Sequence, residues 1–205
     1  MDSLIRFLKD KKWAMACLTI VPALLIIGAI VLLGYPVYTN YVHNRLQGHL
    51  RNELASPTLK DAYANHRLKE GDSLTRLQIP SLGVDVVVVE GISESALRAG
   101  AGHYPATPLP CDAGNVAIAG HRTTYGKPFA NVDQLKAGDQ IILTTPVGTC
   151  TYEVAKPPFV VLPSDTSVIG ATPGQHLLTL TSCTPKGSAS HRIIIQATMR
   201  PTASA

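Results

Sequence analysis

The sequence has few aromatic residues and only a small net charge. Aromatic side chains make up 5% of the 205 residues, whereas glycine (16) and proline (15) are frequent. This composition favours a turn-rich β domain over a helical bundle. The formal net charge is +4, and no basic stripe alternates with aromatic residues, so nucleic acid is not expected as a partner.

Several familiar motifs are missing as well. No pair of cysteines or histidines has zinc-finger spacing, and no glycine-rich phosphate loop is present. We therefore expect neither a metal site nor a cofactor. We also find no internal repeat, and the length suits one domain plus an anchor rather than two domains.

The first distinctive feature is a long uncharged segment near the N-terminus. The run from Trp13 to Gly34 contains no Asp, Glu, Lys or Arg and is long enough to cross a hydrocarbon core of ~30 Å. A cleaved signal peptide has an apolar core of only ~7–15 residues and a small-residue cleavage site, and no clear site follows here. The sequence predicts an uncleaved transmembrane anchor at 13–35. A buried core helix is the alternative.

The residues that flank the run predict its orientation. Lysine and arginine on the short N-terminal side favour a cytoplasmic tail at 1–12, and the basic residues are Arg6, Lys9, Lys11 and Lys12. Trp13 at one end and Tyr35, Tyr38 and Tyr41 at the other suit the two membrane interfaces. We expect a single-pass membrane protein whose C-terminal domain lies outside the cytoplasm.

The rest of the chain divides into a polar stalk at 36–72, a domain at 73–199 and a short tail at 200–205. The domain has seven or eight short strand-like segments and little helix. These segments are 77–79, 84–89, 115–119, 140–145, 149–155, 159–162, 176–181 and 192–198. Short helical turns are predicted at 93–97 and 130–135. The pattern predicts an all-β fold, a closed barrel of about eight strands, with a two-sheet sandwich as the alternative.

Three of the four cysteines lie in the domain, at Cys111, Cys150 and Cys183. Disulfides persist outside the cytoplasm. If Cys183 stays a free thiol, Cys111 and Cys150 are the remaining pair. They form either a disulfide or two small buried thiols.

Cys183, His121 and Arg192 each lie at the end of a predicted strand. An ordinary thiol is mostly protonated at neutral pH, so a nucleophilic cysteine needs a nearby base or a positive field. His121 follows the strand at 115–119, where Gly120 is expected to leave its imidazole exposed. Arg192 opens the strand after the Cys183 loop, and a guanidinium can stabilise an oxyanion. Taken singly, each residue has a more common non-catalytic explanation. Cys183 would be an ordinary buried Cys, His121 a surface His and Arg192 a solvated Arg at a strand end.

The surrounding motifs resemble those of the sortase family. The segment Thr179-Leu180-Thr181-Ser182-Cys183 is similar to the family's T-L-x-T-C motif, and 120–129 resembles the segment around its catalytic His. Arg192 falls where the family has its essential Arg. The stretch 102–105, together with 115–121, is similar to the class E sortases of actinobacteria. The resemblance covers roughly 77–198.

This resemblance implies an eight-stranded barrel and a two-step transpeptidation in a Gram-positive cell wall. Cys183 would attack the Thr carbonyl of a Leu-x-x-Thr-Gly sorting signal on a secreted protein. His121 would protonate the departing Gly amine, and Arg192 would stabilise the oxyanion. A lipid-linked peptidoglycan precursor is the expected amine acceptor. The family also includes calcium-binding members, but the acids here, such as Asp133 and Asp139, are scattered and do not indicate such a site.

Thr181, Ser182 and Tyr104 are expected to contact the substrate. Ser182 stands where the family has Thr, which keeps the hydroxyl and loses a methyl group. Class E sortases favour Ala at the second position of the signal, and Tyr104 is the candidate wall of that pocket. A core Tyr is the alternative reading of that residue.

Other functions remain open at this stage. Transpeptidases that cross-link peptidoglycan peptides place their His and Cys close in sequence, unlike His121 and Cys183. A membrane-tethered β binding module with inert cysteines is a non-enzymatic alternative. Within the sortases, attachment to the cell wall is favoured over pilin polymerisation because no lid insertion is obvious before His121.

Overall fold

The computed structural model describes residues 12–200, and side chains from residue 15 onward. The basic residues Arg6, Lys9 and Lys11, and the side chains of Lys12 and Trp13, lie outside the described part. The tail predicted at 200–205 also lies outside it, except for Arg200.

The described part of the chain forms two compact units, which divide between Tyr38 and Thr39. Helix α2 (Lys12–Leu54) begins in the first unit and ends in the second. In the first unit its apolar side chains from Met15 to Val37 are exposed, and this is one helix long and apolar enough to cross a membrane. Proline at positions 22 and 36 lies within the helix, which a membrane helix tolerates.

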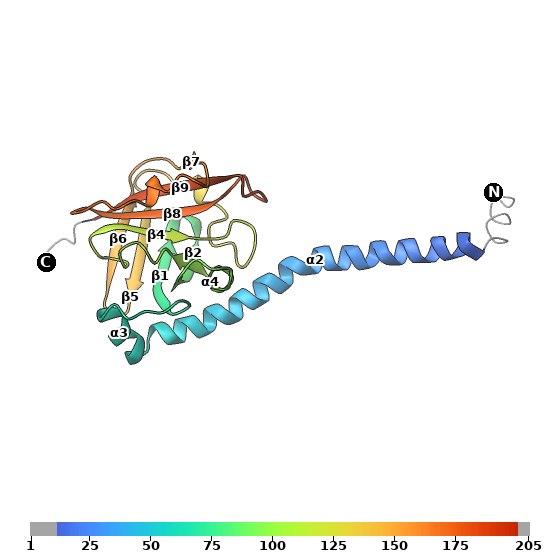
Figure 1. Ribbon diagram of the computed structural model, residues 1–205, viewed down its shortest axis with the longest axis horizontal. Helices are drawn as coiled ribbons and strands as arrows, with labels where there is room; N and C mark the ends of the chain where they lie inside the picture. The colour runs from blue at the N-terminus through green and yellow to red at the C-terminus, as the bar shows by residue number, and fades with distance from the viewer. Residues whose placement is uncertain (1–11, 201–205) are drawn as a thin grey trace. The chain divides into compact units, whose positions relative to one another are not determined.

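The second unit is built on strands, with short helices between them (Figure 1). The strands are β1 (Ser73–Ile79), β2 (Val84–Glu90), β3 (Ala101–His103), β4 (Gly114–Ala119), β5 (Gln140–Thr145), β6 (Gly148–Val154), β7 (Phe159–Val161), β8 (His176–Thr184) and β9 (His191–Met199). The short helices are α3 (Pro57–Ala64) and α4 (Glu94–Ala99), with 3₁₀ turns η1 (Pro80–Leu82), η2 (Val132–Gln134) and η3 (Ser167–Ile169).

The strands close into a barrel. Their order is β6-β5-β1-β2-β3-β4-β8-β9, and β6 pairs with β9 to complete the ring, while the short β7 also pairs with β9. Two neighbouring pairs, β2–β3 and β4–β8, are parallel, and the other pairs are antiparallel. The prediction of a closed barrel of about eight strands is therefore confirmed, and closure rules out the two-sheet sandwich.

Alternate residues of the strands fill the barrel interior. Leu178 and Leu180 of β8 are fully buried beside Val116 and Ile118 of β4. Successive side chains of a strand point to opposite faces. Thr179, Thr181 and Cys183 therefore lie on the outer face of the barrel wall.

Of the two helical expectations, the first is confirmed and the second only in part. The turn predicted at 93–97 is α4, where the Ser93 side chain accepts a hydrogen bond from the Ala96 N–H. The helix predicted at 130–135 is only the single turn η2, and the three-residue strand β3 was not predicted.

The stretch 39–72, interpreted from sequence as part of a stalk, packs in the same compact unit as the barrel. Leu59 and Tyr63 of α3 are buried, and the Tyr63 hydroxyl donates to the Pro110 carbonyl at 2.8 Å. The end of α2 buries Thr39, His43, Gln47 and Leu50. Because three of these four are polar, the stretch carries no apolar pattern that would reveal the packing.

Candidate functional site

Strands β4, β8 and β9 are neighbours and bring the three candidate catalytic residues together. Ala119 of β4 pairs with Thr181 of β8, and two residues further along lie His121 and Cys183. Cys183 is itself the Cα partner of Arg192 on β9. Directly opposed residues of an antiparallel pair project from the same face, so Cys183 and Arg192 share the outer face of the wall.

Cys183 is a half-buried free thiol near the end of β8. Arg192 near the start of β9 is also half-buried. Its Nη1 donates to the carbonyl of Ala189 (3.0 Å), in the loop that joins the two strands, and to that of His191 (3.1 Å), the first residue of β9. The guanidinium is thus held at the loop that follows the thiol.

His121 is half-buried rather than exposed as expected. Its ring lies 5.6 Å from the Tyr125 ring, centroid to centroid, and its Nε2 is buried with no hydrogen-bond partner among the described residues. Burial lowers the pKa of His121 below its ordinary value, Arg98 lowers it further and Glu94 partly opposes the shift. A buried ring nitrogen without a hydrogen-bond partner costs free energy, which a functional role would explain.

Gly120 is required in the turn that carries His121 because of close packing, not because it leaves the imidazole exposed. A Cβ atom on Gly120 would lie 2.5 Å from the fully buried Phe129 ring. The Phe129 N–H also donates to the His121 carbonyl at 3.1 Å. The loop 121–129 therefore returns onto its own beginning, and only glycine leaves room for the contact.

The two hydroxyls before Cys183 have different partners. The Thr181 Oγ1 lies 3.1 Å from the hydroxyl of Tyr104, which reaches it from the loop after β3. The Ser182 hydroxyl is buried and donates to the Gly120 carbonyl at 2.7 Å. The second bond joins the residue before Cys183 to the residue before His121.

The same outer face continues toward the start of β8. Thr179 Oγ1 donates to Asn115 Oδ1 at 2.8 Å, and Asn115 Nδ2 donates to the Val168 carbonyl at 3.0 Å. Val168 lies in η3, within the loop that leads into β8. This loop therefore lies over the face that carries the cysteine, and bounds it at one end.

Two residues near the site were not identified from sequence. Arg122 is buried, and its Nη2 lies 2.9 Å from Asp133 Oδ1, so it fastens the two ends of the loop that begins at His121. His43 of α2 packs beside the same loop. The sequence signal for Arg122 was its position directly after the candidate His121, whereas nothing in the local sequence indicates His43.

Cys111 and Cys150 are joined by a disulfide with an S–S distance of 2.06 Å. Cys150 lies on β6, and Cys111 lies in the loop before β4. Among residues 12–200, no cluster of three or more His, Cys, Asp or Glu side chains is arranged to hold a metal ion.

A closed mixed β-barrel with Cys, His and Arg at three neighbouring strand ends defines the class of protein. Residues 77–200 match the family model of the sortase domain. The chain belongs to the sortase family.

Curated relatives agree with this assignment. Sortase SrtE1 of Streptomyces coelicolor is 33% identical over 169 residues, a match that covers 73% of this chain and 48% of that protein. Sortase D of Bacillus subtilis is 33% identical over 135 residues, covering 64% of this chain and 66% of the relative. The match thus spans about half of the first relative and just under two thirds of the second.

Solved structures are similar over the barrel. Sortase D5 of Clostridium perfringens, described as a transpeptidase, has a TM-score of 0.68 at 30% identity and covers 78% of this chain and 99% of its own. Sortase E of Streptomyces avermitilis has a TM-score of 0.59 at 35% identity, covering 65% and 91%. The S. coelicolor sortase E1 structure, at 33% identity and a TM-score of 0.57, covers 63% and 88% and carries a tripeptide in its active site. The chain is class E-like among the sortases.

Proposed function

We propose that this chain is a cysteine transpeptidase that joins sorting-signal proteins to an amine. The supporting observation is the strand register, in which Cys183 opposes Arg192 and lies level with the β4 extension that leads to His121. The unpartnered Nε2 of His121 is a second support.

In the first half-reaction the Cys183 thiolate attacks the carbonyl carbon of the signal's Thr. The guanidinium of Arg192 stabilises the tetrahedral oxyanion. When the C–N bond to Gly breaks, the His121 imidazolium gives its proton to the departing amine, which leaves a thioester on Cys183. In the second half-reaction an acceptor amine attacks the thioester, His121 takes its proton, and the thiolate departs.

The environment of His121 suits this role. Burial and Arg98 lower the pKa of its imidazole, so the protonated ring is scarcer at neutral pH but is a stronger acid. Because Arg98 is on α4, the charge that tunes the ring comes from an element outside the three catalytic strands.

The sorting signal is proposed to lie along the outer face of β8, with Tyr104 and Thr181 at its second position. Tyr104 reaches across β4 to Thr181, so the pair forms a polar and aromatic wall beside the thiol strand. A small residue such as Ala suits a position next to a tyrosine ring. Ser182, whose hydroxyl is already bonded to Gly120, is proposed to hold the strand ends in register instead.

Residues 13–35 are proposed to anchor the protein in the cell membrane with the N-terminus in the cytoplasm and the barrel outside. The apolar part of α2 and the disulfide support this arrangement. A lipid-linked cell-wall precursor would then present its amine at the same membrane.

The deciding experiment incubates the full-length protein in detergent with Leu-Ala-x-Thr-Gly and Leu-Pro-x-Thr-Gly peptides and amine acceptors. Mass spectrometry should show cleavage between Thr and Gly and a new amide, and Cys183→Ala should give neither. Products that persist in Cys183→Ala would remove the proposal.

Tyr104 is tested by competing the two peptides. Wild type should favour the Ala signal, and Tyr104→Ala should lose that preference while still turning over both peptides. Equal use of both signals by wild type would remove the proposed pocket wall.

A further inference from the structure

The end of α2 packs against the barrel through polar side chains. Thr39, His43, Gln47 and Leu50 form a single buried stripe, spaced by three or four residues. Gln47 accepts from the Val87 N–H at 2.7 Å and donates to the carbonyls of Val87 (3.0 Å) and Ala99 (2.8 Å). This side chain fixes the helix to strand β2, and His43 lies one helical turn before it.

His43 lies directly against the loop that carries His121. A Cβ atom on Gly126 would be 2.3 Å from the His43 ring, and Gly126 has a φ of +72°, so a side chain is disfavoured there on both counts. The Gly126 N–H also donates to Asn40 Oδ1 at 3.3 Å. Two α2 residues therefore hold the backbone of one glycine.

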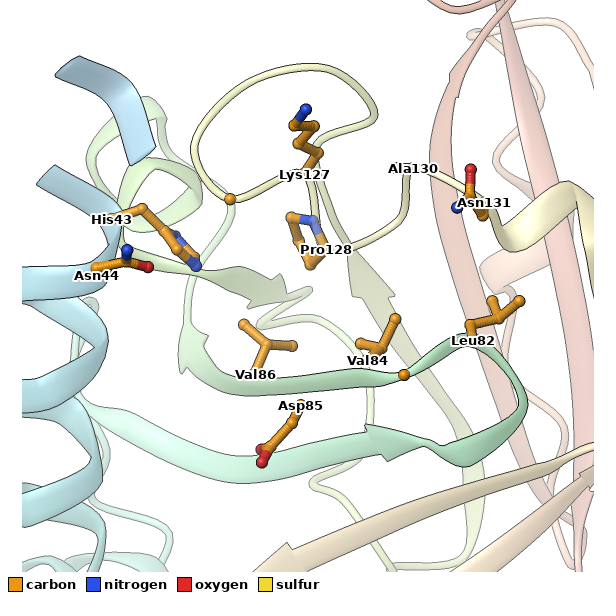
Figure 2. A pocket seen from close by; sticks show the side chains of 12 residues that line it. His43, Asn44, Leu82, Val84, Asp85, Val86, Lys127, Pro128, Ala130 and Asn131 are labelled. Carbon is orange, nitrogen blue, oxygen red and sulfur yellow. The ribbon is translucent and has the colours of Figure 1, made fainter. Parts of the chain in front are cut away.

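Figure 2 shows His43 reaching from α2 toward the loop segment of Lys127 and Pro128, with Val84 and Val86 of β2 below. These residues line a cavity of about 330 Å³ between α2, β2 and the loop. His43 and Asn40 of α2 support the middle of the loop next to this cavity. If the His43 side chain were shortened, the loop would have room to move into the cavity.

The same loop also contacts His121, the proposed general acid and base. Tyr125, next to Gly126, contacts the His121 ring, and the Arg98 guanidinium lies 5.6 Å from the centre of the Tyr125 ring. The backbone of Arg98 in turn forms a hydrogen bond with His43. His43 thus touches the loop and α4, the two elements that border His121.

The charged and titratable groups around His43 and His121 come from three elements. Arg98 and Glu94 belong to α4, His121 and Lys127 to the loop, and Asp85 to β2. Burial lowers the pKa of His43, the hydrogen bond to Arg98 opposes this, and repulsion from His121 lowers it further. A neutral His43 is therefore favoured at neutral pH.

We infer that His43 is a positioning residue for His121. It holds the Gly126 turn and the Arg98 backbone, so that Tyr125 packs on the His121 ring and keeps the imidazole at the thiol. The helix that continues from the proposed membrane anchor is then a structural part of the active site. This inference rests on the proposed function, in which His121 is the general acid and base.

The test compares peptide turnover by full-length His43→Ala and His49→Ala in detergent. His49 is exposed on the same helix, less than two turns after His43, and serves as the matched control. Because small misplacements of a catalytic group cost up to about 100-fold in rate, His43→Ala should lower kcat by roughly 10- to 100-fold with little change in KM. His49→Ala should match wild type.

A pH profile separates positioning from simple loss of folding. Removing His43 lessens the burial of His121, which is the main cause of its lowered pKa, so the limb of the kcat profile governed by His121 should move to higher pH. His43→Gln, which keeps an N–H donor and much of the volume, should recover most of kcat. Thermal unfolding of each variant reports the folded fraction used to correct the rates.

The outcomes are distinct. If wild type forms no thioester and no product, the proposed function fails and the inference fails with it. If wild type is active and the folded fraction of His43→Ala has the kcat and pH profile of His49→Ala, only the inference is overturned.

Discussion

At the scale of single residues, the bond from Ser182 to Gly120 links the two strand ends that carry the thiol and the imidazole. The bond is 2.7 Å long and buried, so the hydroxyl has no access to water as a substitute partner. The family's Thr would place the same hydroxyl there with an added methyl group. The Ser in this chain therefore retains the polar contact.

We predict that Ser182→Ala loses this bond and leaves the Gly120 carbonyl unpaired. The free energy of unfolding should fall by about 1–3 kcal/mol. Ser182→Thr should stay within about 1 kcal/mol of wild type, because it keeps the hydroxyl. Urea unfolding of the full-length protein in detergent measures both. Equal stability of the Ala variant and wild type would contradict this account.

At the scale of elements, the buried stripe of α2 joins the helix to the barrel mainly through polar side chains, with Leu50 adding apolar packing on Val87 and Val89. Gln47 offers strand β2 the same donor and acceptor that a neighbouring strand would offer. A Cβ atom on Gly100 would lie 2.3 Å from the Val87 carbonyl and 2.6 Å from Gln47 Nε2. The glycine therefore makes room for the side chain that completes β2.

Replacing Gln47 should weaken the contact between helix α2 and strand β2. Gln47→Ala leaves the Val87 N–H and two carbonyls without their partner, so we expect a loss of about 3 kcal/mol in the free energy of unfolding. Asn44→Ala, an exposed neighbour on α2, should have no such effect. Chemical unfolding of the two variants side by side tests the difference, and similar midpoints would refute it.

The two half-buried or buried histidines at the contact between α2 and the loop after β4 make the stability of the domain depend on pH. His43 and His121 both have a pKa below the ordinary value of 6.5 in the folded state. The unfolded chain therefore binds more protons at and below that pH, and stability that is complete above pH 6.5 is lost as the pH falls. His43→Ala should reduce the slope of Tm against pH between pH 7 and 5, whereas His49→Ala should not.

The sequence predicted the elements that obey simple patterns. The β-branched run in β2 and the strand before Gly120 were placed within a residue or two, and Cys183, His121 and Arg192 were expected at strand ends. The contribution of α2 escaped prediction because Thr39, His43 and Gln47 are polar, and only the unfilled side of β2 makes their burial favourable. Strand β3 was not predicted because three residues are too few to show the two-residue alternation of a strand.

At the scale of the whole molecule, the disulfide closes a long loop across the barrel. Cys111 precedes β4 and Cys150 lies on β6, 39 residues apart. The bond therefore joins strand β6 to the loop before β4, and these two strands are not neighbours in the barrel.

Reducing the disulfide should destabilise the protein without touching the candidate site. For a loop of 39 residues, chain entropy gives a loss of about 4 kcal/mol. Thermal unfolding of the full-length protein with and without reductant should show a clear drop in Tm. Before reduction, a thiol count under denaturing conditions should find two free thiols, Cys17 and Cys183, rather than four.

The way Gln47 completes β2 has a practical consequence for anyone preparing a soluble fragment. A fragment that starts at Ser73, where the barrel strands begin, would expose unsatisfied backbone groups of Val87 to solvent and to other molecules. Such material should self-associate at high concentration. A fragment that starts at Thr39 retains the covering turn of helix and should remain monomeric.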